Sequence, residues 1–269
     1  MTENTNIERL LVFTGKGGVG KTTLAMCMAC YLKEQGKEVL YVSFEEPEDV
    51  EIFLKLGIKK KTLEVAASAE GYVGKKLGSK TLARWVCETK FFKSLLNMLP
   101  GFSYVILLGN ILELLHNDEN LHIVLDSPSS GHAITMFESC YNFKEVFKSG
   151  LIVDDINKML EYIHQGSILK VYIAALPTEM AIQEGMELHS SLKTMGIENI
   201  DIVINNSLAH MKELEQAPKL PMSLKAKIEL EKNVIENSNQ ISQKIIPHSL
   251  EVNNIQVISD LKPSVGHCA

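Results

Sequence analysis

Residues 14–23, Thr14-Gly15-Lys16-Gly17-Gly18-Val19-Gly20-Lys21-Thr22-Thr23, decide the fold of this chain. They fit the pattern G-x-x-x-x-G-K-[ST], a loop whose backbone N–H groups surround the phosphates of a nucleotide. The glycines let consecutive N–H groups face one anion, and a helix beginning at Lys21 adds its positive end. Lys21 then contacts the β- and γ-phosphates, while the Thr22 hydroxyl is a ligand of Mg²⁺. The pattern therefore predicts a site for ATP or ADP with Mg²⁺, made by Gly15, Lys16, Gly17, Gly18, Val19, Gly20, Lys21, Thr22 and Thr23.

The segments around this loop alternate between strands and helices. Residues 9–13 (RLLVF) are typical of a buried strand, and 22–35 follow a helical pattern that ends at Gly36. The chain has 269 residues, 45% of them hydrophobic, and can bury one large core. We therefore predict one α/β domain over residues 1–269, a doubly wound, mostly parallel sheet flanked by helices. The further predicted strands are 37–43, 121–126, 170–175, 201–204 and 244–247.

Helical insertions are predicted at about 57–120 and 136–168. In the first, no strand is expected, and the apolar spacing predicts one helix over 81–99 and another over 104–116. We interpret this first insertion as a helical lobe on the sheet domain. Beyond the strand at 244–247, the tail has no recognisable element.

The strand 121–126 (LHIVLD) ends in an acid, Asp126. Ligands of doubly wound sheets bind at the carboxyl ends of the strands, so Asp126 is predicted to hold Mg²⁺, through a water molecule. The small residues 127–132 (SPSSGH) suit a loop that senses the γ-phosphate. His132 is either a turn residue or part of that site.

The loop 44–49 (FEEPED) lies at the carboxyl end of another predicted strand. One interpretation is a switch loop in which Glu45 or Glu46 orients the attacking water. The other is a polar cap for the helix that starts near residue 49.

Composition excludes several classes of function. The net charge of −6 argues against a general nucleic-acid binder, whose domain is usually basic. No apolar run is long enough for a membrane span, so we expect a cytoplasmic protein without an integral membrane segment. Cys27 and Cys30 form a C-x-x-C motif inside the helix 22–35, where we expect small core residues; a redox motif or half a zinc site is the alternative.

Lys16, directly after the first glycine, makes the loop resemble the deviant Walker A motif, KGGVGKT, of one ATPase family. That family includes the Min and Par positioning ATPases, the nitrogenase iron protein and the arsenical-pump ATPases. In it, the extra lysine crosses a dimer interface to the partner's nucleotide, and the resemblance implies this role for Lys16. A Min-type protein is disfavoured because the tail 255–269 has one basic residue, Lys262, and no amphipathic stripe.

The strongest resemblance to known proteins is carried by four blocks of the chain, 15–23, 99–115, 124–135 and 175–206. These blocks most resemble the arsenical-pump (ArsA) and tail-anchored-protein-targeting ATPases. By this resemblance, Asn205 hydrogen-bonds the adenine. The resemblance also implies an ATPase that hydrolyses ATP to ADP and phosphate and cycles between open and closed forms. It would work on a client or partner protein, as a homodimer or as a heterodimer with a related ATPase.

The chain departs from this family at the first switch loop. The family has S-T-D-P-A-H there, with an aspartate that orients water, whereas this chain has Ser43-Phe44-Glu45-Glu46-Pro47. A glutamate would have to substitute, so hydrolysis would be slow or partner-dependent. The alternatives are a weakly hydrolysing switch or scaffold, and a factor that targets hydrophobic clients or drives an anion pump. The predicted catalytic residues are Lys16, Glu45, Glu46 and Asp126.

Overall fold

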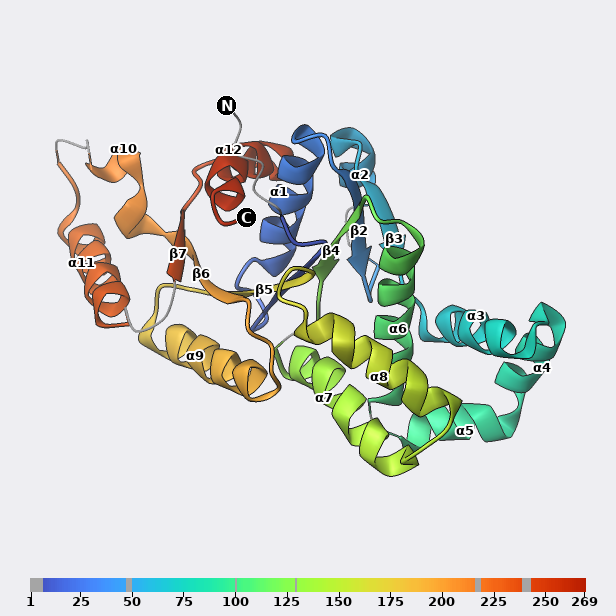
Figure 1. The fold of residues 1–269 in the computed structure, drawn as a ribbon. Helices are drawn as coiled ribbons and strands as arrows, with labels where there is room; N and C mark the ends of the chain where they lie inside the picture. Colours follow the sequence, from blue (N-terminus) through green and yellow to red (C-terminus); the bar gives the residue numbers. More distant parts are fainter. Residues whose placement is uncertain (1–6, 47–49, 100, 129, 216–218, 239–242) are drawn as a thin grey trace.

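The fold is built on one parallel β-sheet. The computed structural model describes residues 7–46, 50–99, 101–128, 130–215, 219–238 and 243–269. Within these ranges, seven strands form a sheet in the order β3-β2-β4-β1-β5-β6-β7, and all the paired strands are parallel (Figure 1). The strands are β1 (Leu10–Gly15), β2 (Glu38–Ser43), β3 (Lys59–Thr62), β4 (Leu121–Asp126), β5 (Leu169–Ala175), β6 (Ile200–Ser207) and β7 (Gln243–Pro247). The predicted doubly wound α/β fold is confirmed.

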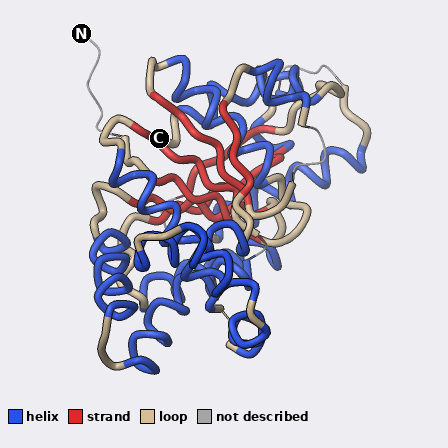
Figure 2. The backbone as a smooth tube through the Cα atoms, turned by 90° about the vertical axis from the view of Figure 1, so that its right-hand side faces the viewer, coloured by secondary structure: helices blue, strands red, loops and turns tan. Residues whose placement is uncertain are grey.

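Helices cover both faces of this sheet, as Figure 2 shows. Helices α1, α2 and α12 pack on one face, and α6, α7, α8 and α9 on the other. Near the β7 edge lie η1 (Leu208–His210), α10 (Lys212–Glu215) and α11 (Met222–Asn237). The remaining helices are α1 (Lys21–Glu34), α2 (Glu51–Leu56), α3 (Val65–Leu77), α4 (Lys80–Glu88), α5 (Lys90–Met98), α6 (Phe102–Asn117), α7 (Ser130–Phe147), α8 (Leu151–His164), α9 (Glu179–Thr194) and α12 (Asn254–Gly266).

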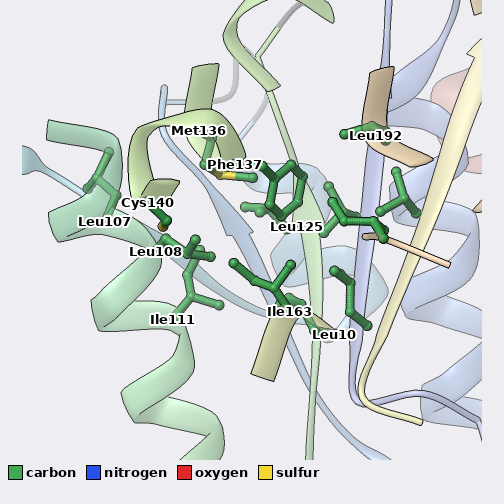
Figure 3. Close-up of a cluster of buried hydrophobic side chains, with 14 of the residues drawn as sticks. Leu10, Leu107, Leu108, Ile111, Leu125, Met136, Phe137, Cys140, Ile163 and Leu192 are labelled. Carbon is green, nitrogen blue, oxygen red and sulfur yellow. The ribbon is translucent and has the colours of Figure 1, made fainter. Parts of the chain in front are cut away.

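The central strand β1 is apolar on both faces because each face meets a helical layer. Successive side chains of a strand point to opposite sides. Leu10 and Val12 accordingly join the core under α6 to α9, whereas Leu11 and Phe13 join the core under α1 and α12. Figure 3 shows part of the first core, where Leu10 lies among side chains of α6, α7 and α8.

A strand that the sequence did not predict, β3, lies at one edge of the sheet. Its residues, KKKT, have no apolar alternation, and a charged strand of this kind is typical of a protected sheet edge. It pairs with β2, with Leu40 opposite Lys59 and Ser43 opposite Thr62. The prediction of an entirely helical segment between 57 and 120 was therefore wrong.

The single helix predicted over 81–99 is two helices, α4 and α5. Thr89 between them is extended, with φ −61° and ψ 144°, and its hydroxyl accepts a hydrogen bond from the Phe92 N–H. Threonine is a good residue to begin a helix in this way, so Thr89 starts α5 in a new direction. Helices α3, α4 and α5 form a lobe beside the sheet, and α6 connects this lobe to β4 (Figure 1).

The tail beyond β7, for which no element was predicted, contains α12. Asn253 begins this helix by accepting a hydrogen bond from the Ile255 N–H at 2.9 Å. Ile258, Leu261 and Val265 are buried in the core shared with α1. Their spacing of three and four residues is an amphipathic stripe, so the prediction that the tail has none was wrong.

None of the helices in the described ranges is by itself long and apolar enough to cross a membrane. Helices α5 and α6 meet the length and composition criteria only as a pair, across a bend of 97°.

Candidate functional site

The predicted phosphate loop lies at the carboxyl end of β1, the middle strand of the sheet, and leads into α1. Two of its glycines are required by the space around them. Gly15 has φ +140°, and a Cβ there would lie 2.3 Å from the carbonyl oxygen of Ala174 on β5. Gly20 has φ +89°, and a Cβ there would lie 2.4 Å from Nδ2 of Asn205. A side chain at Gly15 would displace the loop from β5, and one at Gly20 would collide with the Asn205 side chain.

Helix α1 begins directly after this loop, at Lys21. Among the described residues, no side chain caps the first turn of α1, and the turn contains no acid, so no carboxylate or hydroxyl of the protein occupies its first N–H groups. Such a helix start attracts an anion. The Lys21 ammonium donates to the Lys16 carbonyl at 3.0 Å and so lies over the loop. Burial lowers the pKa of Lys21, and the charge of Asp126 opposes this shift.

Asp126 is the acid that the structure brings to this loop. It ends β4, level with Phe13 of β1 and Ser43 of β2. Its Oδ2 accepts hydrogen bonds from the Thr22 hydroxyl at 2.7 Å and from the Tyr41 hydroxyl at 2.8 Å. Burial raises the pKa of Asp126, while the two hydrogen bonds and the Lys21 charge counteract this rise.

Thr22 and Asp126 fit the magnesium site predicted for them. Both offer hard oxygen atoms, the ligand type that Mg²⁺ prefers, and these atoms are already in contact. Among the described residues, no group of three or more His, Cys, Asp or Glu side chains is placed to hold a metal. A Mg²⁺ ion at Thr22 and Asp126 would therefore take its other ligands from water and phosphate, as this ion commonly does.

Tyr41 is a residue of this site that sequence reasoning missed. Its side chain is fully buried in β2, and burial together with the Asp126 charge raises the pKa of its hydroxyl. The hydroxyl therefore keeps its proton and donates a hydrogen bond to Asp126. The available signal was a hydroxyl-bearing side chain among the apolar residues 39–42, two positions before the carboxyl end of the strand.

The structure separates the two candidate glutamates. Glu46 accepts hydrogen bonds from Lys60, at 2.5 Å, and from Thr62, so it is attached to β3. The hydrogen bond from Lys60 is the main cause of a lowered pKa of Glu46. Glu45 is exposed, and its charge raises the pKa of Asp126. Of the two, only Glu45 thus has an electrostatic effect on Asp126 that the structure records. Pro47 of the predicted switch loop lies outside the described residues.

Lys16 forms an ion pair within its own chain. Its ammonium lies 2.6 Å from Oε1 of Glu184 on α9, and both side chains are partly exposed. Glu184 is a second residue that sequence reasoning missed, because it is 168 positions away along the chain.

Asn205 lies behind the loop. Its Nδ2 donates to the Val19 carbonyl at 2.9 Å, and its buried Oδ1 has no hydrogen-bond partner. The strand was predicted over 201–204, but β6 continues to Ser207 through an irregularity in its pairing with β7. Asn206 has φ +66° at this irregularity, a conformation that asparagine tolerates better than most residues.

The predicted sensor loop 127–132 is shorter than expected, because α7 begins at Ser130. Ser127 is buried, and both its N–H and its hydroxyl donate to the Phe13 carbonyl of β1. Ser129 lies outside the described residues. His132 falls in the first turn of α7, and its side chain also lies outside the described part of the structure.

Cys27 and Cys30 are buried core residues, as predicted. Burial raises the pKa of Cys27 to about 12, so its thiol is neutral and unreactive.

These features together define a class of protein. The central strand of a parallel sheet leads through a glycine-rich loop into a helix that begins Lys-Thr. The neighbouring strand ends in an acid that contacts this threonine. This is the arrangement of a P-loop NTPase.

Comparison with known proteins identifies the family. Residues 8–163, more than half of the chain, match the family described as anion-transporting ATPase, and the chain belongs to this family. The putative arsenical pump-driving ATPase 2 of Aquifex aeolicus (strain VF5) is 27% identical, over 90% of this chain and 94% of its own length. ATPase BagA of Mycobacterium tuberculosis is 23% identical over 78% of this chain and 68% of its own length. The arsenical pump-driving ATPase of Acidiphilium multivorum is 24% identical over 76% of this chain, which spans 40% of that protein. The predicted ArsA-type family is confirmed.

Proposed function

We propose that this protein hydrolyses ATP in the presence of Mg²⁺ and uses the cycle to change its association with a second ATPase chain. The observation that carries the proposal is the contact of the Thr22 hydroxyl with the Asp126 carboxylate, directly beside Lys21. A cation and two oxygen ligands at the start of a helix are what a nucleotide phosphate and its Mg²⁺ require.

Each residue of this site would have a separate task. The Lys21 ammonium leaves the Lys16 carbonyl and binds the β- and γ-phosphates. Thr22 and Asp126 would hold Mg²⁺, and this ion would offset the negative charge of the phosphates. Tyr41 keeps one oxygen of Asp126 in place. Catalysis of this kind is mainly positioning and charge neutralisation.

Glu45 is the better candidate to orient the attacking water. Glu46 is already occupied by Lys60 and Thr62 on β3, whereas Glu45 is exposed and near enough to affect Asp126. The water oxygen forms a bond to the γ-phosphorus, the bond to the β-phosphate oxygen breaks, and ADP is the leaving group. The unpaired Oδ1 of Asn205 supports the predicted adenine contact, since it could accept a hydrogen bond from the adenine amino group.

Lys16 would act between two chains. In this structure it pairs with Glu184 of its own chain, and this pair is solvent-exposed and therefore weak. A nucleotide phosphate on a second chain carries more negative charge than one glutamate. We therefore expect Lys16 to leave Glu184 when two chains meet around ATP, so that ATP tightens the dimer and ADP loosens it.

A phosphate-release assay with Mg-ATP tests this function. Lys21→Ala is expected to abolish both ATP binding and phosphate release. Glu45→Gln is expected to slow phosphate release far more than Glu46→Gln. Glu51→Gln, an exposed acid on α2, is the matched control and should release phosphate at the unaltered rate. ATP binding that survives Lys21→Ala unchanged would contradict the proposed site.

The second candidate is a switch or scaffold that binds ATP and hardly hydrolyses it. Two observations favour it: Glu46 and Lys16 are both held by ion pairs within the chain. Phosphate release that is undetectable for this chain alone, but appears when a related ATPase is added, would support the switch. Phosphate release that this chain shows alone, and that disappears in Lys16→Ala, would support the proposal that the chain is itself an ATPase. Sedimentation with an ATP analogue, with ADP and without nucleotide then measures the assembly.

A further inference from the structure

The helical lobe has a surface unlike the rest of the molecule. Between residues 75 and 98 the chain has six basic residues and one acid, although its total net charge is −6. Among the described side chains of this segment, five apolar ones are strongly exposed. These are Leu77, Leu82, Trp85, Phe91 and Met98, with exposed fractions of 48%, 52%, 67%, 78% and 77%. We call this surface, on the end of α3 and on α4 and α5, the lobe tip.

The exposed apolar side chains of the lobe tip lie together on one side of each helix. Leu82 and Trp85 are three positions apart on α4, and Phe91 and Met98 are seven apart on α5, so each pair shares one side of its helix. Figure 1 shows α4 and α5 at the outer end of the lobe, away from the sheet. These faces are therefore available to a partner outside the chain.

Three lysines of the lobe tip have no ion-pair partner among the described residues. Lys75, Lys76 and Arg84 pair with Glu113, Asp155 and Glu70, respectively. Lys80 and Lys90, by contrast, are the first residues of α4 and α5, and Lys93 lies one turn further along α5. A positive charge at a helix start is unfavourable, and neither helix has an acid in its first turn. These lysines therefore do not stabilise the helices, and an external anion would explain their positions.

We propose that the lobe tip binds the surface of an anionic membrane. A nucleic acid would pair with the lysines but leave the exposed leucine, phenylalanine and methionine in water. An apolar protein segment would cover these side chains but leave the lysines unpaired. Anionic headgroups above an apolar layer satisfy both, and helices with basic residues beside Trp, Phe and Leu are typical of this interface.

The lobe tip would lie on the membrane without crossing it. Helix α6, the apolar half of the bent pair α5–α6, has its leucines and isoleucines in the core under the sheet. A span would have to remove this helix from the core. The strongly acidic remainder of the chain is repelled by the same surface, which orients the lobe tip towards it.

Trp85 provides a direct readout because it is the only tryptophan of the chain. The full chain, without nucleotide, is titrated with vesicles of phosphatidylcholine containing about one-third phosphatidylserine, and with vesicles of phosphatidylcholine alone. We expect the Trp85 emission to shift to the blue and the protein to co-sediment with the anionic vesicles only. High salt should weaken this binding, because it screens the lysines.

Two matched pairs of variants make the test specific. Lys90→Ala with Lys93→Ala should weaken binding about 25-fold, at about fivefold for each lysine near an anionic surface. The control, Lys225→Ala with Lys227→Ala, removes two exposed lysines from α11 and should change binding less than twofold. Phe91→Ser should weaken binding at least fivefold, and Leu230→Ser, at another exposed apolar site on α11, should not.

The proposal is overturned if neither kind of vesicle shifts the Trp85 emission, or if both double-lysine variants bind equally well. It is also overturned if an apolar helical peptide shifts the emission while anionic vesicles do not, since the lobe tip would then be a protein docking site. None of these outcomes depends on ATP binding, so they leave the proposed ATPase function intact.

Discussion

Replacing Tyr41 by phenylalanine isolates one hydrogen bond of the candidate site. The ring fills the same buried space in β2, but Asp126 loses the donor at 2.8 Å and keeps only Thr22. A hydrogen bond to a charged group contributes about 1.5–3 kcal/mol to stability, against about 0.5–1.5 kcal/mol for a neutral pair. We expect the free energy of unfolding at neutral pH to fall by about 2 kcal/mol, and Tm by about 4–8 °C.

The loss of unfolding free energy caused by Tyr41→Phe should be larger at neutral pH than at acidic pH. Burial raises the pKa of Asp126 in the folded protein. A raised pKa means that the folded state favours the protonated acid, so the stability from this group is present at low pH and is lost as pH rises through that pKa. Tyr41→Phe raises the pKa of Asp126 further. The difference between the two proteins is therefore largest at neutral pH, and it shrinks as pH falls and Asp126 becomes protonated.

Tyr172→Phe is the matched control. Tyr172 is also fully buried, and its hydroxyl donates to a neutral acceptor, the Cys268 carbonyl, at 3.1 Å. The free energy of unfolding of Tyr172→Phe should be about 1 kcal/mol lower than that of the unaltered protein, independently of pH. Urea unfolding of the three proteins in steps from about pH 8 to about pH 4 measures the differences. Equal losses for the two variants at neutral pH, with no change on acidification, would refute the assignment of Asp126 as a charged acceptor.

Further variants test the loop and its lysine. Gly20→Ala should lower Tm strongly, because its φ of +89° costs a non-glycine residue about 1–2 kcal/mol and the new Cβ meets Asn205; Gly17→Ala, with open space around it, should cost far less. Glu184→Gln removes the exposed partner of Lys16, an ion pair worth about 0.2–1 kcal/mol. Because a dimer of two such chains releases two of these pairs, an ATP-induced dimer should tighten by at most about 30-fold in sedimentation. An unchanged or weaker dimer would mean that this ion pair does not compete with the partner's nucleotide.

Local sequence was enough to predict those parts of the site whose residues lie close together along the chain. The spacing of glycines, lysine and threonine in residues 15–23 places the loop between a strand and a helix, because backbone conformation there depends on neighbouring residues. The apolar run ending at Asp126 similarly predicted β4. Alternating strands and helices were enough for the α/β class, because such segments bury their apolar faces only as stacked layers.

The contacts between distant residues were decided by the tertiary structure. Strand β3 has no apolar pattern and exists because β2 offers it a pairing edge, which in turn places Lys60 and Thr62 against Glu46. Tyr41 and Asp126 meet because β2 and β4 are neighbours in the sheet, 85 positions apart in the chain. Neither pair follows from local spacing, since both depend on which strands lie side by side.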